Sequence, residues 1–192
     1  MYVWNETGNG MWADIATADS CTITNCTFVG NVRGASYSAA VYIGGEGLKR
    51  IQNLVSAYND VAWPPYDEAT ASNLCFGTLN NVAIDNICLY PTKNLPGFDD
   101  TEIYLTWPTE VLIAEPGLVS IPDPPNGYWG DPHLGDDSIL IDAGNQYVDI
   151  DPATPGIQFL PEYGLDGQFR IVDGDGDGVA TVDIGAYEYS PY

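Results

Sequence analysis

The first half of the chain repeats a short pattern: an apolar residue, any residue, an asparagine and a second apolar residue. The three copies occupy residues 23–28, 51–56 and 84–89 and place their asparagines at Asn25, Asn53 and Asn86. A second short apolar segment precedes each copy at the same offset, at residues 13–15, 41–43 and 74–76. The asparagines are 28 and 33 residues apart, a spacing typical of stacked repeats. Short strands at recurring positions, separated by Gly and Asn and without a helical period, predict an all-β chain built as a β-solenoid.

The recurring asparagines predict a hydrogen-bonded ladder. Equivalent residues in neighbouring coils of a solenoid lie about one strand spacing, or roughly 4.8 Å, apart. An asparagine amide both donates and accepts, so Asn25, Asn53 and Asn86 can bond along the column. Each bond contributes about 0.5–1.5 kcal/mol net. The alternative is three unrelated turns, which is weaker because the flanking apolar residues keep the same register.

The chain is strongly acidic and yet able to bury a core. Its 192 residues include 27 Asp and Glu against 5 Lys and Arg, giving a net charge of −22, while 45% of residues are hydrophobic. Such a surface repels phosphate backbones and anionic lipid headgroups, which argues against nucleic-acid binding and membrane association. No apolar run is long enough to cross a bilayer. The acidity indicates either a solvated surface tuned for solubility or a set of divalent-cation sites.

An alternating Asp-Gly run near the C-terminus is the strongest candidate for a cation site. Asp173, Asp175 and Asp177 alternate with glycines and match the first half of an EF-hand-type loop. The twelfth position of that loop is Ile184, so we expect the backbone carbonyl of Val179 and the carboxylate of Asp183 to complete the site, with Ca²⁺ as the ion. The alternative is a glycine-rich turn whose acids face water. Alternating apolar residues over 179–189 predict a terminal strand that closes the core.

Several stretches resemble bacterial families. The segment I-T-N-C-T-F-V-G-N at 23–31 resembles the repeat of polymorphic outer-membrane proteins and related right-handed parallel β-helix proteins. The C-terminal part resembles the module called choice-of-anchor Q, through A-E-P-G-L-V at 114–119, H-L-G-D-D-S-I-L-I-D-A-G-N at 133–145, L-D-G-Q-F-R at 165–170 and V-D-I-G-A-Y-E-Y at 182–189. Pro132 departs from that family, which usually has an aromatic residue there. The resemblance implies an exported or cell-surface right-handed parallel β-helix with a β-rich C-terminal cap.

Looser segments divide the chain and carry aromatic residues. Pro91–Asp100 is a break, so we expect β-helix coils over 1–95 and C-terminal strands with a cap over 96–192, including strands at 103–107 and 111–113. Two loops, 61–70 and 121–131, present aromatic side chains beside carboxylates: Trp63, Tyr66, Tyr128 and Trp129. Such rings can stack on sugars while the polar groups bind hydroxyls. The alternative for each ring is that it covers the core.

The sequence offers little catalytic machinery. His133 is the only histidine and no nucleophile pattern accompanies it. The paired acids Asp99-Asp100 and Asp136-Asp137 are expected by chance in so acidic a chain. Arg170, the one basic residue of the last half, is predicted to be a structural clamp paired with nearby acids. The alternative is that it binds a carboxylate of a substrate. The four cysteines match no zinc spacing and are interpreted as buried thiols in preference to disulfides.

We therefore expect a non-catalytic scaffold, secreted or at the cell surface, that binds glycan, mediates adhesion or assembles with like chains. One alternative is a carbohydrate-active enzyme, a polysaccharide lyase or glycoside hydrolase, whose catalytic groove lies on coils outside or only partly inside this chain. The other is a filament subunit that stacks end to end through unpaired strand edges. The N-terminus has neither the basic start nor the apolar run of a signal peptide, so we expect either a removed leader or a fragment of a longer protein.

Overall fold

A computed structural model describes residues 2–3, 11–15, 19–33, 38–61, 71–90, 111–123, 126–147 and 160–191. Within these ranges the regular structure is almost entirely β, in three parallel sheets and one antiparallel pair. No helix of the described residues is long and apolar enough to cross a membrane. The prediction of an all-β chain with parallel pairing is confirmed.

The largest sheet has five strands in the order β1-β3-β6-β9-β10. Their bounds are Tyr2–Val3, Ser20–Val29, Leu48–Ala57, Val82–Tyr90 and Val111–Leu112. Every neighbouring pair in it is parallel. β10 joins this sheet from beyond residue 95, so the sheet continues past the expected boundary between coils and cap.

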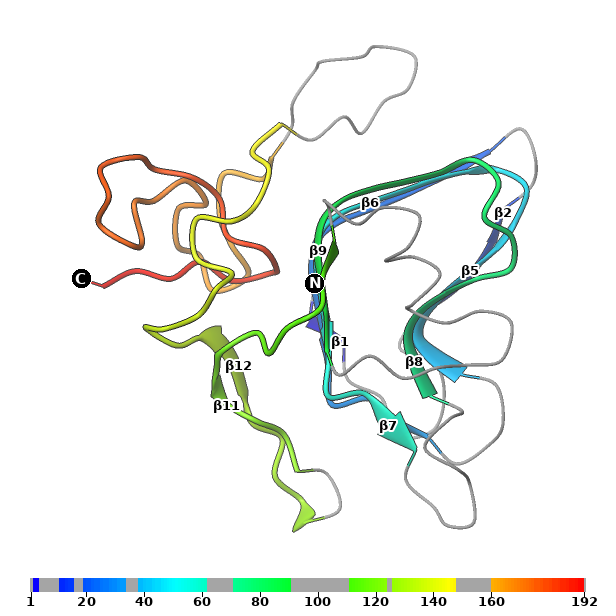
Figure 1. The fold of residues 1–192 in the computed structure, drawn as a ribbon, viewed down its shortest axis with the longest axis horizontal. Coiled ribbons are helices and arrows are strands. Elements are labelled where there is room, and N and C mark those ends of the chain that lie inside the picture. The colour runs from blue at the N-terminus through cyan, green and yellow to red at the C-terminus, as the bar shows by residue number, and fades with distance from the viewer. Residues whose placement is uncertain are drawn as a thin grey trace.

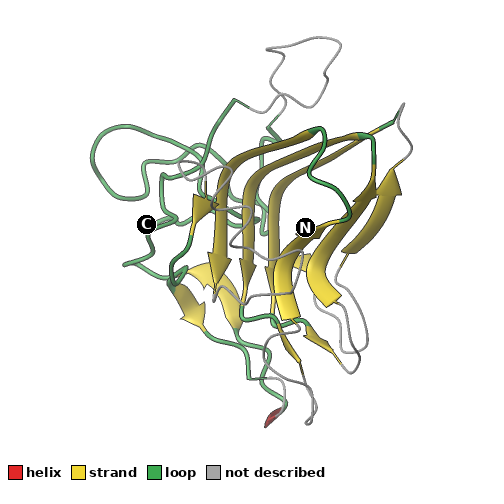
Figure 2. Cartoon of the chain, turned by 45° about the vertical axis from the view of Figure 1, so that its right-hand side comes forward, coloured by secondary structure: helices red, strands yellow, loops and turns green. Residues whose placement is uncertain are grey.

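Two smaller sheets repeat the parallel arrangement. The order β2-β5-β8 joins Met11–Ile15, Ser38–Gly45 and Ala71–Phe76, and β4 (Val32–Arg33) pairs with β7 (Asp60–Val61). Successive repeats thus contribute one strand to the large sheet and one to the three-stranded sheet, and the strands of a kind lie side by side (Figures 1 and 2). All six apolar segments that the repeat predicts lie inside strands of these two sheets.

The core lies between the large sheet and the three-stranded sheet. Ile23, Ile51 and Ile84 are paired in register across β3, β6 and β9, and all three are buried. They share one apolar cluster with Val41 and Leu74 from the facing sheet. Burial of matching side chains from each repeat holds the strands in register, because a slip of one residue would turn apolar side chains toward water.

The three repeat asparagines mark a bend in the large sheet. Asn25, Asn53 and Asn86 have φ values of 49°, 50° and 47°, in the left-handed region that asparagine tolerates better than most residues. The pairing register passes over Asn25 and Asn53 and resumes on their far side at Cys26 and Leu54. Figure 1 shows the ribbons of β6 and β9 turning a corner. The asparagines therefore turn each strand within a sheet that stays continuous.

The C-terminal half packs against the outer side of the large sheet. β11 (Leu118–Ser120) and β12 (Asp131–Leu134) form an antiparallel pair, and residues 135–147 and 160–191 follow mainly as turns. A second apolar cluster combines Val55 and Cys88 of the large sheet with Leu134, Leu140 and Ile184 of the C-terminal half. Figure 1 shows this segment beside β9, opposite the three-stranded sheet.

The expected terminal strand over 179–189 is wrong. Only Thr181 forms a ladder contact in this stretch, an isolated bridge to Val172. The predicted alternation does appear in burial, since Val182, Ile184 and Ala186 are all buried. The backbone amides of two of these buried residues bond to a side chain and to a turn instead of the backbone of a partner strand: that of Ala186 donates to Thr27 Oγ1 and that of Ile184 to the carbonyl of Leu140. A segment that buries every second residue without pairing to another strand has the same sequence pattern as a true β-strand.

Two expected loops and one expected strand fall outside the described residues, whereas the side chains of three of the four cysteines are described. The loops at 62–70 and 91–100 and the expected strand at 103–107 lie outside them, as does the side chain of Cys75. Cys21, Cys26 and Cys88 are free thiols, and burial raises the pKa of Cys88 to about 12, so this thiol stays protonated.

Candidate functional site

The repeat asparagines bond to one another and to the C-terminal segment. Asn53 Nδ2 donates to Asn25 Oδ1 at 2.9 Å and to the backbone carbonyl of Asn145 at 2.8 Å, and Asn53 Oδ1 accepts the Asn145 amide at 2.8 Å. Asn86 Nδ2 donates to the carbonyl of Ala143 at 2.7 Å. One ladder bond therefore joins the first two repeats, while Asn53 and Asn86 hold residues 143–145 against the bend.

Neighbouring polar side chains extend the same attachment. Asp85 lies beside Gln52 in the register and accepts hydrogen bonds from the Gln52 amide at 3.0 Å and from the Asn145 side chain at 2.5 Å. Gln52 also donates to the carbonyl of Tyr147 at 3.1 Å. The polar groups on this side of β6 and β9 are thus occupied by the chain's own residues 143–147.

A second cluster of buried asparagines was not predicted from the sequence. Asn59 is buried at 5% exposure. Its Oδ1 accepts both the backbone and side-chain amides of Asn31, and its Nδ2 donates to Phe28 O, Ser56 Oγ and Asn73 Oδ1. The 28-residue separation of Asn31 and Asn59 equals that of Asn25 and Asn53, so the repeat itself carried the signal.

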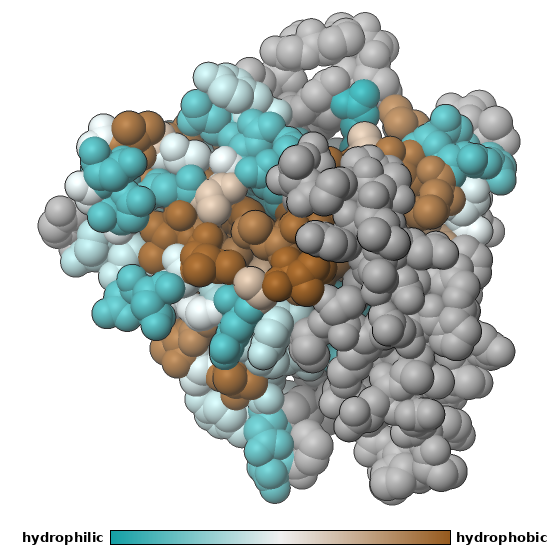
Figure 3. Space-filling view, viewed as in Figure 1, coloured by the Kyte–Doolittle hydropathy of each residue, from teal (hydrophilic) through white to brown (hydrophobic). Residues whose placement is uncertain are grey.

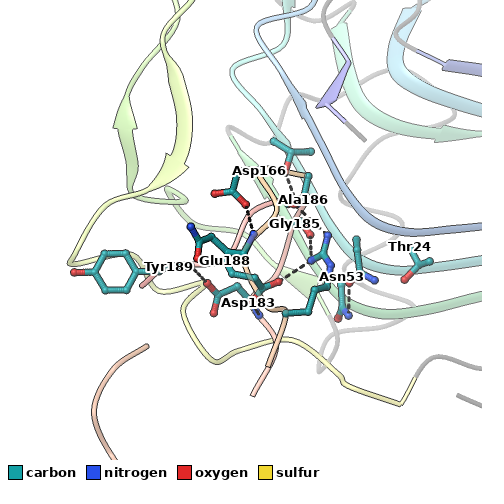
Figure 4. Close-up of polar contacts among 12 residues, drawn as sticks. Thr24, Asn53, Asp166, Asp183, Gly185, Ala186, Glu188 and Tyr189 are labelled. Carbon is teal, nitrogen blue, oxygen red and sulfur yellow. Dashed lines mark hydrogen bonds and ion pairs between the residues drawn. The ribbon is translucent and has the colours of Figure 1, made fainter. Parts of the chain in front are cut away.

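Arg170 forms a buried clamp within the C-terminal half. Figure 4 labels its three partners, Gly185, Ala186 and Glu188. Its side chain is 5% exposed, and Nη1 donates to Glu188 Oε1 at 2.7 Å and to the carbonyl of Gly185, while Nη2 donates to the carbonyl of Ala186. The other oxygen of Glu188 accepts the Asp183 amide at 2.9 Å. The guanidinium thus ties the 165–170 motif to the 182–189 motif.

Two buried acids share this one guanidinium. Burial raises the pKa of Asp183 to about 6 and, with the adjacent Asp183 charge, raises that of Glu188 to about 9; Arg170 opposes both shifts. A carboxyl whose pKa is higher in the folded state binds its proton more tightly there than in the unfolded chain. Each carboxyl therefore adds to the stability of the fold at a pH below its unfolded pKa, 3.8 for Asp183 and 4.5 for Glu188. This stabilisation is lost as the pH rises through the folded pKa.

The Asp-Gly run forms a loop whose acids meet a residue from far along the chain. Carboxylate oxygens of Asp142, Asp173 and Asp175 lie within 4.8 Å of one another. Asp142 Oδ2 accepts the amides of Gly174 and Asp175, both at 2.9 Å, so it is held at the start of the loop. Three oxygen ligands in this space suit a hard cation whose remaining positions are filled by carbonyls or water.

The other expected ligands lie elsewhere. Asp177 Oδ1 accepts the Val179 amide, and the three-acid group does not include it. Both oxygens of Asp183 accept backbone amides, from Asp142 at 2.8 Å and Tyr189 at 2.6 Å. Asp183 is therefore engaged in the buried Arg170 network, and Asp142 takes the place expected for it beside the loop.

Backbone amides also offset the charge of the loop acids. Asp173 accepts the amides of Gly176 and Gly178 through its two oxygens, and Asp175 Oδ1 accepts that of Asp177. Hydrogen bonds from several N–H groups stabilise carboxylates. Like-charge repulsion in this loop therefore does not by itself require a cation.

Two of the four predicted aromatic ligand residues are described. Tyr128 and Trp129 follow the turn between β11 and β12 and are 51% and 39% exposed. The Tyr128 hydroxyl donates to Ser120 Oγ at 2.7 Å, which fixes the ring across the hairpin. Trp63 and Tyr66 lie outside the described residues. Figure 3 shows further apolar surface on the C-terminal half. Two other rings of this half, Tyr163 and Phe169, are exposed, and their centroids lie 5.1 Å apart.

No family model, curated protein or solved structure matches this chain. The resemblances noted in the sequence therefore stay predictions.

Proposed function

We propose that this chain is part of a right-handed parallel β-helix that serves as a non-catalytic scaffold, exported or displayed at a cell surface. Three successive repeats place matching strands in the same two parallel sheets, with their apolar residues stacked in register. Such stacking is the signature of solenoid architecture. The handedness follows from the strong preference of parallel strand crossovers.

One observation favours the scaffold over an enzyme. Carbohydrate-active β-helices need polar side chains free to act on a substrate along the sheet. Here Gln52, Asn53, Asp85 and Asn86, the polar row at the bend, bond to residues 143–147 of the same chain. These side chains attach the C-terminal module to the coils.

The surface chemistry favours a neutral glycan as the bound partner. A net charge of −22 repels acidic polysaccharides, whereas the exposed faces of Tyr128 and Trp129 offer stacking surface for uncharged sugar rings. Assembly with like chains is the alternative scaffold role, because the outer strands of parallel sheets present unpaired backbone groups.

Affinity electrophoresis separates these roles. The protein is run through gels that contain a neutral or an acidic polysaccharide, beside the Trp129→Ala variant and a Val119→Ala control on the same hairpin. Retardation by neutral polysaccharide that Trp129→Ala abolishes and Val119→Ala preserves supports glycan binding. Concentration-dependent growth in mass by light scattering, with no retardation, supports self-assembly. Release of unsaturated or reducing sugar products by the wild-type protein overturns the scaffold proposal.

We also propose that the 173–178 loop binds Ca²⁺ with Asp142, Asp173 and Asp175 as side-chain ligands. The observation in its favour is that Asp142, more than 30 residues away, is brought to the loop by its bonds to Gly174 and Asp175. An ion bound only by the folded chain raises the melting temperature as its concentration rises. We expect stabilisation by millimolar-range Ca²⁺ over chelator, lost in Asp142→Asn and kept in Asp136→Asn. A melting curve indifferent to Ca²⁺ rejects the site.

A further inference from the structure

The only histidine of the chain lies between two carboxylates on different segments. His133 belongs to β12, and its Nδ1 is 2.5 Å from Asp131 Oδ1 on the same strand. Its Nε2 faces Asp166 Oδ2 in the turn at 165–168, at 3.7 Å. The ring also contacts Tyr187, with centroids 4.2 Å apart. None of these side chains belongs to the Asp142 group or to the Arg170 clamp.

The contacts of the ring decide which nitrogen carries a proton in the neutral form. An ionised carboxylate only accepts hydrogen bonds, so Nδ1 is the donor toward Asp131. Asp131 Oδ1 also accepts the His133 backbone amide at 3.1 Å, which holds the carboxylate in place. Neutral His133 therefore presents the Nε2 lone pair to Asp166. A ring N–H held by a carboxylate is the arrangement that orients metal-binding histidines.

The Nε2 to Asp166 separation fits two ligands of one ion better than a direct bond. A charge-assisted N–H···O bond closes to about 2.7–2.9 Å, and the observed separation is 3.7 Å. Two ligands about 2.0–2.2 Å from a tetrahedral Zn²⁺ lie roughly 3.4 Å apart. Asp166 Oδ1 accepts the Gln168 amide at 3.3 Å, which leaves Oδ2 turned to the histidine.

We propose that His133 Nε2 and Asp166 Oδ2 bind a divalent transition-metal ion of the Zn²⁺ class, with Asp131 as the positioning residue. Imidazole and carboxylate ligands suit this class, and imidazole discriminates against Ca²⁺. The His133 and Asp166 side chains are 43% and 28% exposed, so an ion and its waters can reach them. The strongly negative field of the chain attracts dications to the site. The ion would bridge β12 and the 165–168 turn.

The single histidine makes a specific measurement possible. The ring signals of His133 are followed by NMR in the full chain during titration with Zn²⁺, with excess Ca²⁺ present to occupy all-oxygen sites. We expect saturable, one-to-one shifts at Nε2. Asp166→Asn should weaken binding by about tenfold or more, and Asp131→Asn by roughly 10-fold through loss of orientation. Asp136→Asn, an exposed acid of the same segment, is the matched control and should bind as the wild type does.

Two results overturn the proposal. Zn²⁺ shifts that persist with unchanged affinity in Asp166→Asn show a lone surface histidine binding the ion without a site. Ring signals that do not respond to Zn²⁺ show that His133 serves only as an ion-pair partner of the two acids. Far-ultraviolet circular dichroism of each variant confirms that it is folded, and His133→Gln provides the baseline for Zn²⁺ bound elsewhere, measured by calorimetry.

Discussion

Replacement of Asn53 tests the junction between the repeats and the C-terminal segment. The side chain is fully buried, and its amide makes three hydrogen bonds, one to Asn25 and two to the backbone of Asn145. Its backbone is left-handed, with φ at 50°. Asn53→Ala removes all three bonds and places alanine, which tolerates the left-handed conformation less well than asparagine, at this position.

The expected loss has two parts. A polar group stranded away from water costs about 1–3 kcal/mol. Asn25 Oδ1 is deeply buried, but Asn145 is only partly so, and water can replace some of its bonds. We therefore expect about 3 kcal/mol from the lost bonds, and about 1 kcal/mol more from the left-handed backbone. Glycine adopts the left-handed conformation without strain, so Asn53→Gly should lose mainly the energy of the hydrogen bonds.

Urea unfolding of the variants measures both parts through the midpoint and slope. Asn80→Ala is the matched control, because Asn80 is exposed and its side-chain amide donates to Glu46 at 3.1 Å. That variant should stay within about 0.5 kcal/mol of the wild type. If Asn53→Gly is as stable as Asn80→Ala, the three amide bonds contribute nothing and our account of the junction is refuted.

Two further predictions concern the core and the clamp. Ile51→Ala should lower the free energy of unfolding by about 2–5 kcal/mol, since the side chain is 1% exposed. In the same urea assay Ile139→Ala, at an exposed position, should change it by less than about 0.5 kcal/mol. Equal losses in the two variants would contradict the assignment of the core. Glu188→Gln should flatten the fall in stability between pH 5 and pH 9, because the pKa of Glu188 is raised to about 9 and that of Asp183 to about 6; parallel stability–pH curves for variant and wild type would contradict it.

The repeat made the strands of the first half predictable. Matching apolar residues recur with the asparagines, and β3, β6 and β9 contain all three copies. The template also located the left-handed positions, because asparagine is among the few residues that adopt them at small cost. A repeated pattern of this kind can be recognised in a single sequence, because each copy lies within a short stretch of residues.

The C-terminal half was less predictable, because its order comes from side chains that hold backbone groups across long separations. Asp142 reaches the loop at 173–178, and Asn145 reaches Asn53 across 92 residues. Neither residue belongs to a spacing pattern that identifies its partner. The I-D-A-G-N segment at 141–145 did stand out, but its role is to bind the sheet, which only the fold reveals.

The contacts of Gly185 explain why the C-terminal turns need the repeats to hold their shape. Its amide donates to the carbonyl of Asn53, and its φ is 123°, outside the range that side chains readily adopt. A Cβ there would lie 2.9 Å from Thr27 Oγ1 and 3.1 Å from Val55 Cγ2. The glycine thus lets the turn approach the sheet closely enough for the Ala186 amide to reach Thr27 Oγ1. Arg170 binds the carbonyl of Gly185, and Thr27 accepts the amide of Ala186, so the clamp and the sheet hold the two polar groups of the same Gly185–Ala186 peptide. Loss of either contact should therefore loosen the other, and the C-terminal half should unfold together with the sheet as one cooperative unit.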